Sequence, residues 1–541
     1  MMQKETIEKF LKKNYLISPD FFEEYAPNDE LSVTLDPENK PLILSKDLFF
    51  IFKKNKKVAE INWLEFEKSR ALLEKGRDTK IYEHFLDILL YDLNTEKKKA
   101  IDHIVQDIKQ PDPIILVEKD VIVPSIVVLD SFRGEVIQEK DVMSFVHHFK
   151  FRYDSLKDIL MQRPELQNTL SISKLLTRKE KSSASLIGII QDKRITQNGH
   201  VLLTLEDPTG FITVLINKER NSIFTLAKDL VLDDVIGVTG AGNGEIVFCE
   251  NIFFPDVPVT KESKKCPDDV AASFISDIHV GSKQFMEKEF LRFISWLNLT
   301  IEKDIEIAKK IKYLFVLGDL VDGVGVYPGQ YENLFIKDIT AQYDKLAEYF
   351  STIRKDINII LCPGDHDALR LAHPQPVLDK KFARKLWELK NITQVSNPSF
   401  VNIHSSQQFP GFNVLLYHGH GYHYYFDAVD SLKKLDTPHN PRHIMKFLLK
   451  RRHLAPTHTS TIYVPDHKED PLVIKHVPDI FTSGHLHKSD VSFYNNICMI
   501  NCSCWQSQTE FQVKEGNFPD PAKVPVLLLQ RGEVEVLDFN D

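Results

Sequence analysis

The spacing of apolar residues changes along the chain, and each change predicts a different kind of element. Over residues 1–105, apolar side chains recur at helical spacing among many charges, as in TIEKFLKKNYL and NWLEFEKSRALLEKG. Residues 106–180 contain a strand-like stretch between Pro111 and Ser131, followed by a helical stretch near 139–166. We predict a mainly helical N-terminal region and then a connector with some secondary structure.

Residues 181–256 carry five short β-rich runs, which predict a small barrel. Turn residues such as Asn198-Gly199 separate the runs, and a helical segment, SIFTLAKDLVL, lies between the third and fourth. Five strands with a helix after the third is the order of an OB-fold, a barrel that often binds single-stranded nucleic acid. Packing against a partner explains such a barrel equally well. These strands show no strong aromatic platform, which weakens the nucleic-acid interpretation.

The last half of the chain has a different pattern. The polar, proline-containing stretch 257–269 predicts a linker. From 270 to 541, apolar runs alternate with helical stretches near 286–311 and 340–356, which predicts a layered α/β domain. The final run, VPVLLLQRGEVEVLDF, predicts a closing β-hairpin that turns at Arg531-Gly532.

The composition is that of an ordinary folded protein. Hydrophobic residues make up 43% of the 541, and no stretch approaches the ~18 consecutive apolar residues of a membrane span. A net charge of −9 argues against a broad electrostatic DNA binder, so a DNA contact would need a local groove, bound metal or a basic partner. Six cysteines without a C-x-x-C pair, and a charged N-terminus without a signal-like apolar core, predict a cytoplasmic location.

Polar clusters that follow apolar runs are the informative feature of the last domain. Of the 20 histidines, 11 fall between His418 and His487. Because the carboxyl ends of strands in an open α/β sheet meet at one crevice, residues just past each strand can converge there. The clusters are Asp277-Ile278-His279, Gly318-Asp319-Leu320-Val321-Asp322-Gly323, Gly364-Asp365-His366-Asp367, His418-Gly419-His420 and Gly484-His485-Leu486-His487.

These residue types favour transition metals. Aspartate oxygens with imidazole nitrogens suit Mn, Fe, Zn or Ni, whereas six-oxygen Mg or Ca sites would not need four histidines. In Asp277-x-His279 and His485-x-His487, both side chains reach one metal only if the backbone turns there. On a straight strand they would lie about 6.5 Å apart and could serve two neighbouring metals. One such cluster is weak evidence, but five in order are poorly explained by chance.

The stretches SDIHVGS, LGDLVDG, PGDHD, YHGHG and SGHLH, within about 270–505, resemble the successive motifs of the calcineurin-like metallophosphoesterase superfamily. With DALRLAHPQPVL after the third motif, and a barrel and a helical region ahead, the layout resembles the small, proofreading subunits of archaeal family-D DNA polymerases. The resemblance implies an α/β metallophosphoesterase domain, with a two-layered sheet core flanked by helices, behind an OB-fold and a mainly helical N-terminal region. It is weakest over residues 1–110.

The resemblance also implies a role for each matched residue. Two divalent cations are expected, Mn in activity, with Fe, Zn or Ni as alternatives. His366 would sit beside the scissile phosphate as general acid or charge stabiliser. One metal would be held by Asp277, His279 and His487, the other by Asp365, His418 and His485, and Asp319 would bridge both.

Asp365 departs from the family pattern, which has asparagine at this position. An aspartate oxygen can occupy the same ligand position as an asparagine oxygen, so metal binding is still expected. The third carboxylate should hold metal more tightly, but it should also make bound water less acidic and repel phosphate. The departure therefore bears on the rate more than on the site.

Other nearby residues have two interpretations each. Asp322 and Asp367 are expected to form hydrogen bonds around the site rather than bind metal. Arg370 and His420 are candidate substrate-binding residues, and His423 could also touch phosphate, with plain surface exposure as the alternative for all three. A basic run either guides a DNA backbone or forms a solvated helix face: Arg442, Lys446, Lys450, Arg451 and Arg452.

The leading hypothesis is the small subunit of a replicative DNA polymerase with two-metal 3′→5′ exonuclease activity on single-stranded or mismatched 3′ ends. The implied partner is the polymerase's large catalytic subunit. One alternative is a catalytically weak or inactive scaffold for that subunit, and another is a repair nuclease or phosphatase on the same core. No stretch matches a sliding-clamp binding motif.

Overall fold

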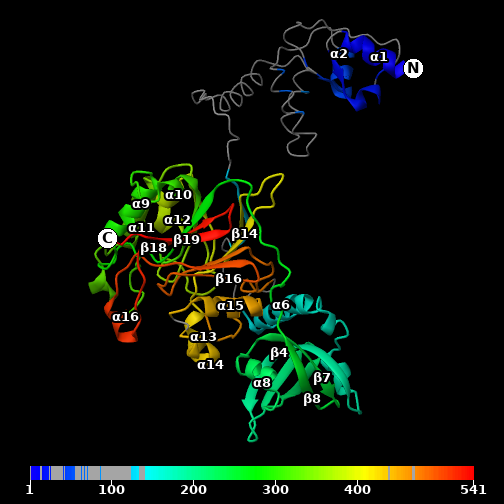
Figure 1. The fold of residues 1–541 in the computed structure, drawn as a ribbon, viewed down its shortest axis with the longest axis vertical. Coiled ribbons are helices and arrows are strands. Elements are labelled where there is room, and N and C mark those ends of the chain that lie inside the picture. The colour runs from blue at the N-terminus through cyan, green and yellow to red at the C-terminus, as the bar shows by residue number, and fades with distance from the viewer. Residues whose placement is uncertain are drawn as a thin grey trace. The chain divides into compact units, whose positions relative to one another are not determined.

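The structure is a computed structural model, and it divides into two compact units, Met1–Asp120 and Val121–Asp541 (Figure 1). Each unit is described by itself. In the larger unit the structure describes residues 124–132, 140–436, 439–465 and 469–540, and in the smaller unit residues 2–12, 15–23, 25, 41, 43–54, 63, 66, 70 and 86.

The smaller unit has an aromatic core. The Phe21 ring lies 5.3 Å from that of Phe10 and 4.7 Å from that of Phe49, measured between centroids. Most of the predicted helix NWLEFEKSRALLEKG lies outside the described residues, as does the first part of the predicted strand-like stretch. The described elements are α1 (Met2–Leu11), β1 (Leu16–Ile17), η1 (Pro19–Glu23), β2 (Ile43–Leu44) and α2 (Lys46–Lys54).

The first sheet of the larger unit has six strands in the order β12-β11-β10-β9-β18-β19. Strands β9 to β12 run parallel, and the predicted C-terminal hairpin, β18 with β19, joins antiparallel to β9. The bounds are β9 (Ala271–Ile275), β10 (Ile311–Leu317), β11 (Asn358–Cys362), β12 (Ile392–Gln394), β18 (Lys523–Leu528) and β19 (Glu533–Asp538).

The second sheet also has six strands, in the order β16-β17-β15-β14-β13-β3. Strands β14, β15 and β17 run parallel. Its edge strand β3 comes from the region predicted as a connector and pairs antiparallel with β13. The bounds are β3 (Ile126–Ser131), β13 (Ser399–Ile403), β14 (Phe412–Leu416), β15 (Ile480–Ser483), β16 (Asp490–Tyr494) and β17 (Ile497–Asn501).

The two sheets pack face to face. Successive residues of a strand point to opposite faces, so a single strand can contribute to two separate cores. Tyr313 and Phe315 of β10 are buried in one cluster with Val414 of the second sheet. Leu314 and Val316, from the same strand, belong to a different cluster with the helices. This alternation places a core between the sheets and another outside the first sheet, which confirms the mixed α/β architecture.

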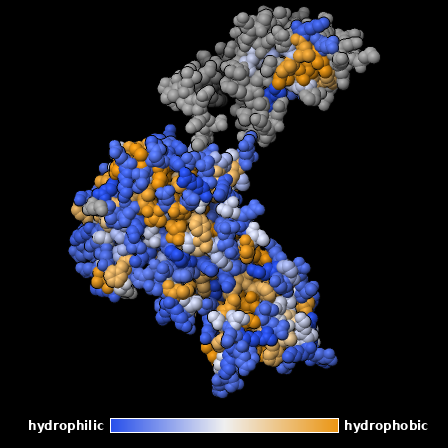
Figure 2. Space-filling model, in the orientation of Figure 1, coloured by the Kyte–Doolittle hydropathy of each residue, from blue (hydrophilic) through white to orange (hydrophobic). Residues whose placement is uncertain are grey.

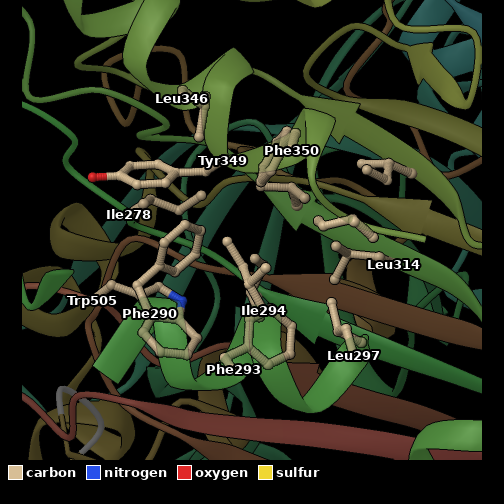
Figure 3. Packing of buried hydrophobic residues seen from close by; sticks show 14 of the residues in the cluster. Ile278, Phe290, Phe293, Ile294, Leu297, Leu314, Leu346, Tyr349, Phe350 and Trp505 are labelled. Carbon is tan, nitrogen blue, oxygen red and sulfur yellow. The ribbon is translucent and has the colours of Figure 1, made fainter. Parts of the chain in front are cut away.

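Helices cover both outer faces (Figure 1). Figure 3 shows Phe290 and Ile294 of α9 packed with Leu346 and Phe350 of α11 over Leu314. Over the first sheet lie α9 (Glu287–Leu297), α10 (Ile305–Lys310), α11 (Ile339–Ser351) and α12 (Lys380–Glu388), and over the second α13 (Tyr422–Ala428), α14 (Asp430–Lys434) and α15 (Arg442–Arg451).

The prediction of one helix over 286–311 is wrong. Helix α9 ends at Leu297 and α10 begins at Ile305. Between them Leu299 and Asp304 have φ values of 62° and 51°, in the left-handed region that a continuous α-helix cannot contain.

The five predicted β-rich runs form a closed barrel in the order β4-β5-β6-β8-β7, with α8 (Asn221–Lys228) after the third strand. Its interior is apolar and includes Leu186, Leu203 and Val238. The strands are β4 (Ser182–Ile195), β5 (Val201–Asp207), β6 (Gly210–Ile216), β7 (Val235–Gly242) and β8 (Ile246–Phe253), preceded by α6 (Val142–Leu160), η2 (Pro164–Leu166) and α7 (Ile172–Leu176).

The segment predicted as a linker is held against the second sheet. Lys261 and Lys264 each place their Nζ 2.7 Å from a carboxylate oxygen of Asp479. Figure 2 shows mainly hydrophilic residues on the visible face of the larger unit, interrupted by apolar patches. Across the described ranges, no helix has the length and apolar character needed to cross a bilayer.

Candidate metal centre

Each of the five polar clusters directly follows a strand of one of the two sheets. The first three follow β9, β10 and β11 of the first sheet, and the other two follow β14 and β15 of the second. Within each sheet these strands are parallel, so the clusters leave at the same end. The structure therefore brings six of the seven predicted ligands into groups whose donor atoms lie close enough to share a cation. The seventh, Asp365, is outside these groups but lies 3.8 Å from His418 and 3.4 Å from His485.

The backbone turns sharply at most of these ligands. Asp277 and His279 have φ values of 50° and 52°, and His485 and His487 have 69° and 55°. Asp319 follows the same pattern at 47°. Left-handed φ is uncommon for residues other than glycine and tends to collect at functional sites. The turns explain how side chains two positions apart point into one site.

The first group of ligands is compact. The Nε2 atom of His487 lies 3.3 Å from Oδ1 of Asp277 and 3.3 Å from Nε2 of His279. The ring of His279 also lies 3.8 Å, through Nε2, from Oδ2 of Asp319. Asp277, His279 and His487 can thus offer one atom each to a single cation.

The second group shares Asp319 with the first. Nε2 of His418 lies 3.3 Å from Oδ2 of Asp319 and 3.8 Å from Oδ2 of Asp365. Nδ1 of His485 lies 3.4 Å from the same Asp365 oxygen. Because one oxygen of Asp319 faces both His279 and His418, Asp319 stands between the two groups.

His366 lies beside the first group and also forms a possible metal-binding group with His279 and Asp319. Its ring centroid is 4.7 Å from that of His279, and its backbone N–H donates to Oδ1 of Asp319 at 2.8 Å. Its Nδ1 is 2.7 Å from the carbonyl oxygen of Asp322. A carbonyl only accepts, so Nδ1 carries a proton and Nε2 is the ring atom left for another partner.

Two glycines allow this density of side chains. Gly318 has a φ of 85°, and a Cβ there would lie 2.5 Å from Nδ1 of His418. A Cβ on Gly484 would lie 2.7 Å from Oδ2 of Asp277 and closer still to Ser276. Larger residues at these positions would displace ligands.

The three ligand carboxylates are held in their charged form. Burial opposes this, yet His418 and His366 hold the pKa of Asp319 well below its usual range. His487 likewise lowers the pKa of Asp277 against its burial, and His420 with His418 lowers that of Asp365. Within the described ranges, no lysine or arginine forms an ion pair with any of the three.

The donor set fits divalent cations. Three donor atoms are buried and have no hydrogen-bond partner among the described residues: Oδ1 of Asp277, Nε2 of His418 and Nε2 of His485. Buried polar atoms without partners are costly, and a ligated metal would satisfy them. Mixed carboxylate and imidazole donors suit Mn, Fe, Zn or Ni.

The predicted supporting residues surround this core. Oδ1 of Asp322 lies 3.2 Å from Nδ1 of His279. Asp367 accepts hydrogen bonds from the backbone of Gly364 at 2.8 Å and from the Tyr343 hydroxyl at 2.9 Å. Burial, followed by the charge of Asp319, raises the pKa of Asp367 to about 7. Neither carboxylate belongs to a possible metal-binding group in the described chain.

The weaker substrate candidates differ in position. His420 lies at the site, with Nδ1 3.0 Å from Oδ2 of Asp365. His423 is next to it, its ring centroid 5.1 Å from that of His485. Arg370 points elsewhere: its Nε and Nη2 donate to the Pro374 carbonyl, and its guanidinium stacks on the Phe132 ring.

Both interpretations of the basic run are wrong for its last two members. Arg451 is buried, with Nε 3.0 Å from Oδ1 of the barrel residue Asp234. Arg452 is also buried and donates to the carbonyl oxygens of Ile474 and Lys475. Arg451 thus links α15 to the barrel, and Arg452, directly after α15, links it to the segment at Ile474 and Lys475.

Three positioning residues were not predicted. The Nε2 of Gln375 donates to Oδ1 of Asp365 at 3.3 Å, and Asn397 links Gln375 to the backbone N–H of His418. The Nε2 of Gln512, from α16 (Glu510–Glu515), lies 3.0 Å from Nδ1 of His487. Isolated amide side chains carry no spacing signal, so nothing in the sequence marked these three residues.

Comparison with known proteins places the chain in a family. Residues 273–491 match the family model that describes the B-subunits of DNA polymerases alpha and epsilon. A DNA polymerase II small subunit of Methanothermobacter thermautotrophicus is 38% identical over 402 residues, covering 74% of this chain and 80% of that protein.

Two further relatives carry the same description. The Methanocaldococcus jannaschii protein is 36% identical, covering 81% of this chain and 72% of that protein. The Pyrococcus furiosus protein is 39% identical, covering 75% of this chain and 65% of that protein. A solved archaeal phosphodiesterase covers 50% of this chain and 99% of its own at 12% identity, with a TM-score of 0.25 that is too low to argue from. The chain belongs to the family of archaeal DNA polymerase II small subunits.

Proposed function

We propose that this small subunit is a metal-dependent 3′→5′ exonuclease that hydrolyses the terminal phosphodiester bond of a DNA 3′ end. The observation that carries the proposal is the convergence of the predicted ligand side chains, six of them in groups close enough to share a cation, with His366 beside them. A subunit that only held the polymerase together would have no need for three buried, ionised carboxylates without lysine or arginine partners.

The two groups of side chains suggest two cation positions. Asp277, His279 and His487 would hold one cation, and Asp365, His418 and His485 the other, with Asp319 between them. Two divalent cations, Mn in the first instance, would neutralise phosphate charge and lower the pKa of a coordinated water.

His366 is the proposed catalytic residue. Its Nδ1 is fixed by the carbonyl of Asp322, which directs Nε2 away from the protein backbone. Because Nδ1 already carries one proton, Nε2 donates a hydrogen bond to the scissile phosphate or to the departing 3′ oxygen only in the doubly protonated ring. Burial opposes that form, but the charge of Asp319 raises the pKa of His366 overall and so favours it. General-acid help of this kind contributes roughly 10²–10⁴ in rate.

The extra charge of Asp365 is partly offset by two neighbouring side chains, His420 and Gln375. Its Oδ2 faces Nδ1 of His420, and its Oδ1 accepts from Gln375. We propose that His420 acts mainly on Asp365 and contacts substrate phosphate only secondarily. The contacts of Arg370 with Pro374 and Phe132 do not support a role in phosphate binding.

The proposed partner is the large catalytic subunit of the polymerase, since the relatives are described as small subunits. We also propose that the barrel is an OB-fold, on the basis of its strand order and the helix after the third strand. One side of it packs on the phosphoesterase domain through Asp234 and Arg451, so only its remaining surface is open to DNA or to the partner.

The test is Mn²⁺-dependent release of nucleotides from a 5′-labelled single-stranded oligonucleotide. The His366→Ala variant should release them at least about a hundredfold more slowly. The matched control is His439→Ala, which removes an exposed histidine paired only with Asp436 and should cleave like the wild type. Equal rates for His366→Ala and wild type would refute the assignment.

A further inference from the structure

The segment that follows Asp322 exposes an unusual number of apolar side chains. This segment, residues 323–338, is here named the rim loop and includes η3 (Gln330–Asn333). Phe335 is 80% exposed and Tyr331 is 53% exposed. Val324 and Val326 are also exposed. Two large rings on a surface loop gain nothing from packing, so they call for another explanation.

The rim loop lies beside the candidate catalytic group. The ring of Tyr327 is 6.2 Å from the ring of His366, centroid to centroid. The loop begins directly after Asp322, whose carbonyl is 2.7 Å from Nδ1 of His366. Near its other end, the backbone N–H of Phe335 donates to the carbonyl of Gly281, two residues from the ligand His279.

Buried amides hold the rim loop in shape. Gln330 donates through Nε2 to both the carbonyl and a carboxylate oxygen of Asp322, and it accepts from the backbone N–H of Val326. Gln342 accepts from the N–H of Gly323 and donates to its carbonyl. The exposed rings therefore project from a fixed backbone.

A positive charge accompanies the rings. Nζ of Lys337 lies 4.2 Å from the centroid of Tyr331, and Nζ of Lys283 donates to the carbonyl of Glu332 within the loop. Exposed aromatic rings next to lysines are features by which proteins bind single strands without reading their sequence, because every base has a π-face.

We propose that the rim loop stacks the unpaired bases at a DNA 3′ end on Tyr331 and Phe335, which positions the terminal phosphodiester at His366. This rests on the proposed exonuclease function and names its preferred substrate, a frayed or single-stranded end. Bases within a duplex are already stacked on each other, so a paired end would lose that stacking in order to engage the loop.

The first experiment measures stacking directly and does not need cleavage. Oligonucleotides carry 2-aminopurine either in the three 3′-terminal positions or about twelve nucleotides away, and they bind the full-length His366→Ala chain in Ca²⁺. We expect the terminal probe alone to be quenched, and Tyr331→Ala with Phe335→Ala to abolish the quenching. Quenching that survives the double substitution would overturn the proposal.

The second experiment separates this proposal from the proposed function. Hydrolysis of bis(p-nitrophenyl) phosphate by the wild type with Mn²⁺ tests the chemistry on a substrate without bases. If no hydrolysis occurs, the proposed exonuclease activity is contradicted, and the quenching experiment alone then decides whether the rim loop binds DNA. The double variant should raise KM for the oligonucleotide about tenfold or more, with a smaller effect on kcat. Phe493→Ala, an exposed phenylalanine on edge strand β16, is the matched control.

Two further measurements separate DNA binding by the rim loop from a folding defect in the variant and from binding of the large subunit. Wild-type protein should show the same rise in KM for an oligonucleotide with three abasic residues at its 3′ end, a result that needs no variant. If the double variant binds and cleaves DNA normally but no longer assembles with the large subunit, the rim loop is a subunit interface and the proposal is wrong.

Discussion

Two buried charged clusters in the larger unit are built for different purposes. The metal-ligand cluster gathers Asp277, Asp319 and Asp365 with histidines. The second, here called the Arg152 cluster, gathers Arg152, His148 and His453 around Asp470. Both are buried and both hold aspartates in the charged form.

The Arg152 cluster contains its own counter-charge. Nε of Arg152 lies 2.7 Å from Oδ2 of Asp470, and the backbone N–H of Leu472 donates to Oδ1. His453 accepts at Nδ1 from the N–H of Ala455, which leaves its Nε2 proton for Asp470 at 2.9 Å. A permanent cation on the chain therefore balances the carboxylate.

The metal-ligand cluster has no lysine or arginine paired with its aspartates among the described residues. What distinguishes the two clusters is therefore not burial but whether a permanent cation of the chain balances the carboxylate. This difference can be tested by changing one aspartate in each.

Asp319→Asn should produce the largest effect on function. Loss of the shared carboxylate should lower Mn²⁺ affinity and nuclease rate by at least about a hundredfold. The unfolding temperature without metal should fall less than in Asp470→Asn, because the amide oxygen can still accept from the backbone N–H of His366 and no arginine is left buried without a counter-charge. Metal titration, nuclease assays and thermal melting check this, with the exposed Asp356→Asn as control. A large loss of metal-free stability would mean that the two clusters are alike.

Asp470→Asn should do the reverse. It leaves Arg152 buried without its counter-charge, which typically costs about 3–5 kcal/mol in unfolding free energy. Metal content of the remaining folded protein should equal that of the wild type. Denaturant unfolding with metal analysis measures both, and unchanged stability would contradict the structural role given to the Arg152 cluster.

His453→Gln should flatten the response of stability to acid. Burial, followed by the charge of Arg152, lowers the pKa of His453 to about 4. An unfolded histidine titrates near 6.5. The unfolded state therefore binds the extra proton between pH 6.5 and 4, and stability falls as the pH drops through that window. Unfolding free energies across the window should show a slope smaller by up to about 1.4 kcal/mol per pH unit in the variant. Identical slopes in the variant and the wild type would show that a group other than His453 takes up this proton on unfolding.

Asp365→Asn should have the smallest effect, since it restores the residue usual in the wider superfamily. Removing one of three ligand charges should raise the Mn²⁺ dissociation constant by roughly tenfold or less, because affinity follows ligand charge count. At saturating metal the nuclease rate should hold or rise. Paired titrations and rate measurements decide this, and complete loss of metal binding would show that the aspartate is required.

The sequence reveals the site better than its surroundings. Asp277, His279 and the other ligands follow apolar strands in order, and strand ends in parallel sheets must converge. The turns that aim them were not determined by the sequence, because the i, i+2 spacing also allowed a straight strand that serves two neighbouring metals, and His485 and His487 do lie in different groups. Here the chemistry lies in short local motifs.

What could not be foreseen depends on contacts between distant segments. The pairing of β3 with β13 joins residues separated by more than 250 positions, and nothing local marks it. The basic run looked like a surface feature because its partner Asp234 lies in the barrel. The break between α9 and α10 depends on left-handed residues in a stretch with no glycine or proline.

Anomalous diffraction from crystals grown with Mn²⁺ tests the central claim most directly. We expect two peaks about 3.5–4 Å apart, one among Asp277, His279 and His487 and the other beside Asp365 and His418, with Asp319 within reach of both. A single peak elsewhere, or none at saturating Mn²⁺, would show that these side chains form a closed polar cluster like the one around Arg152.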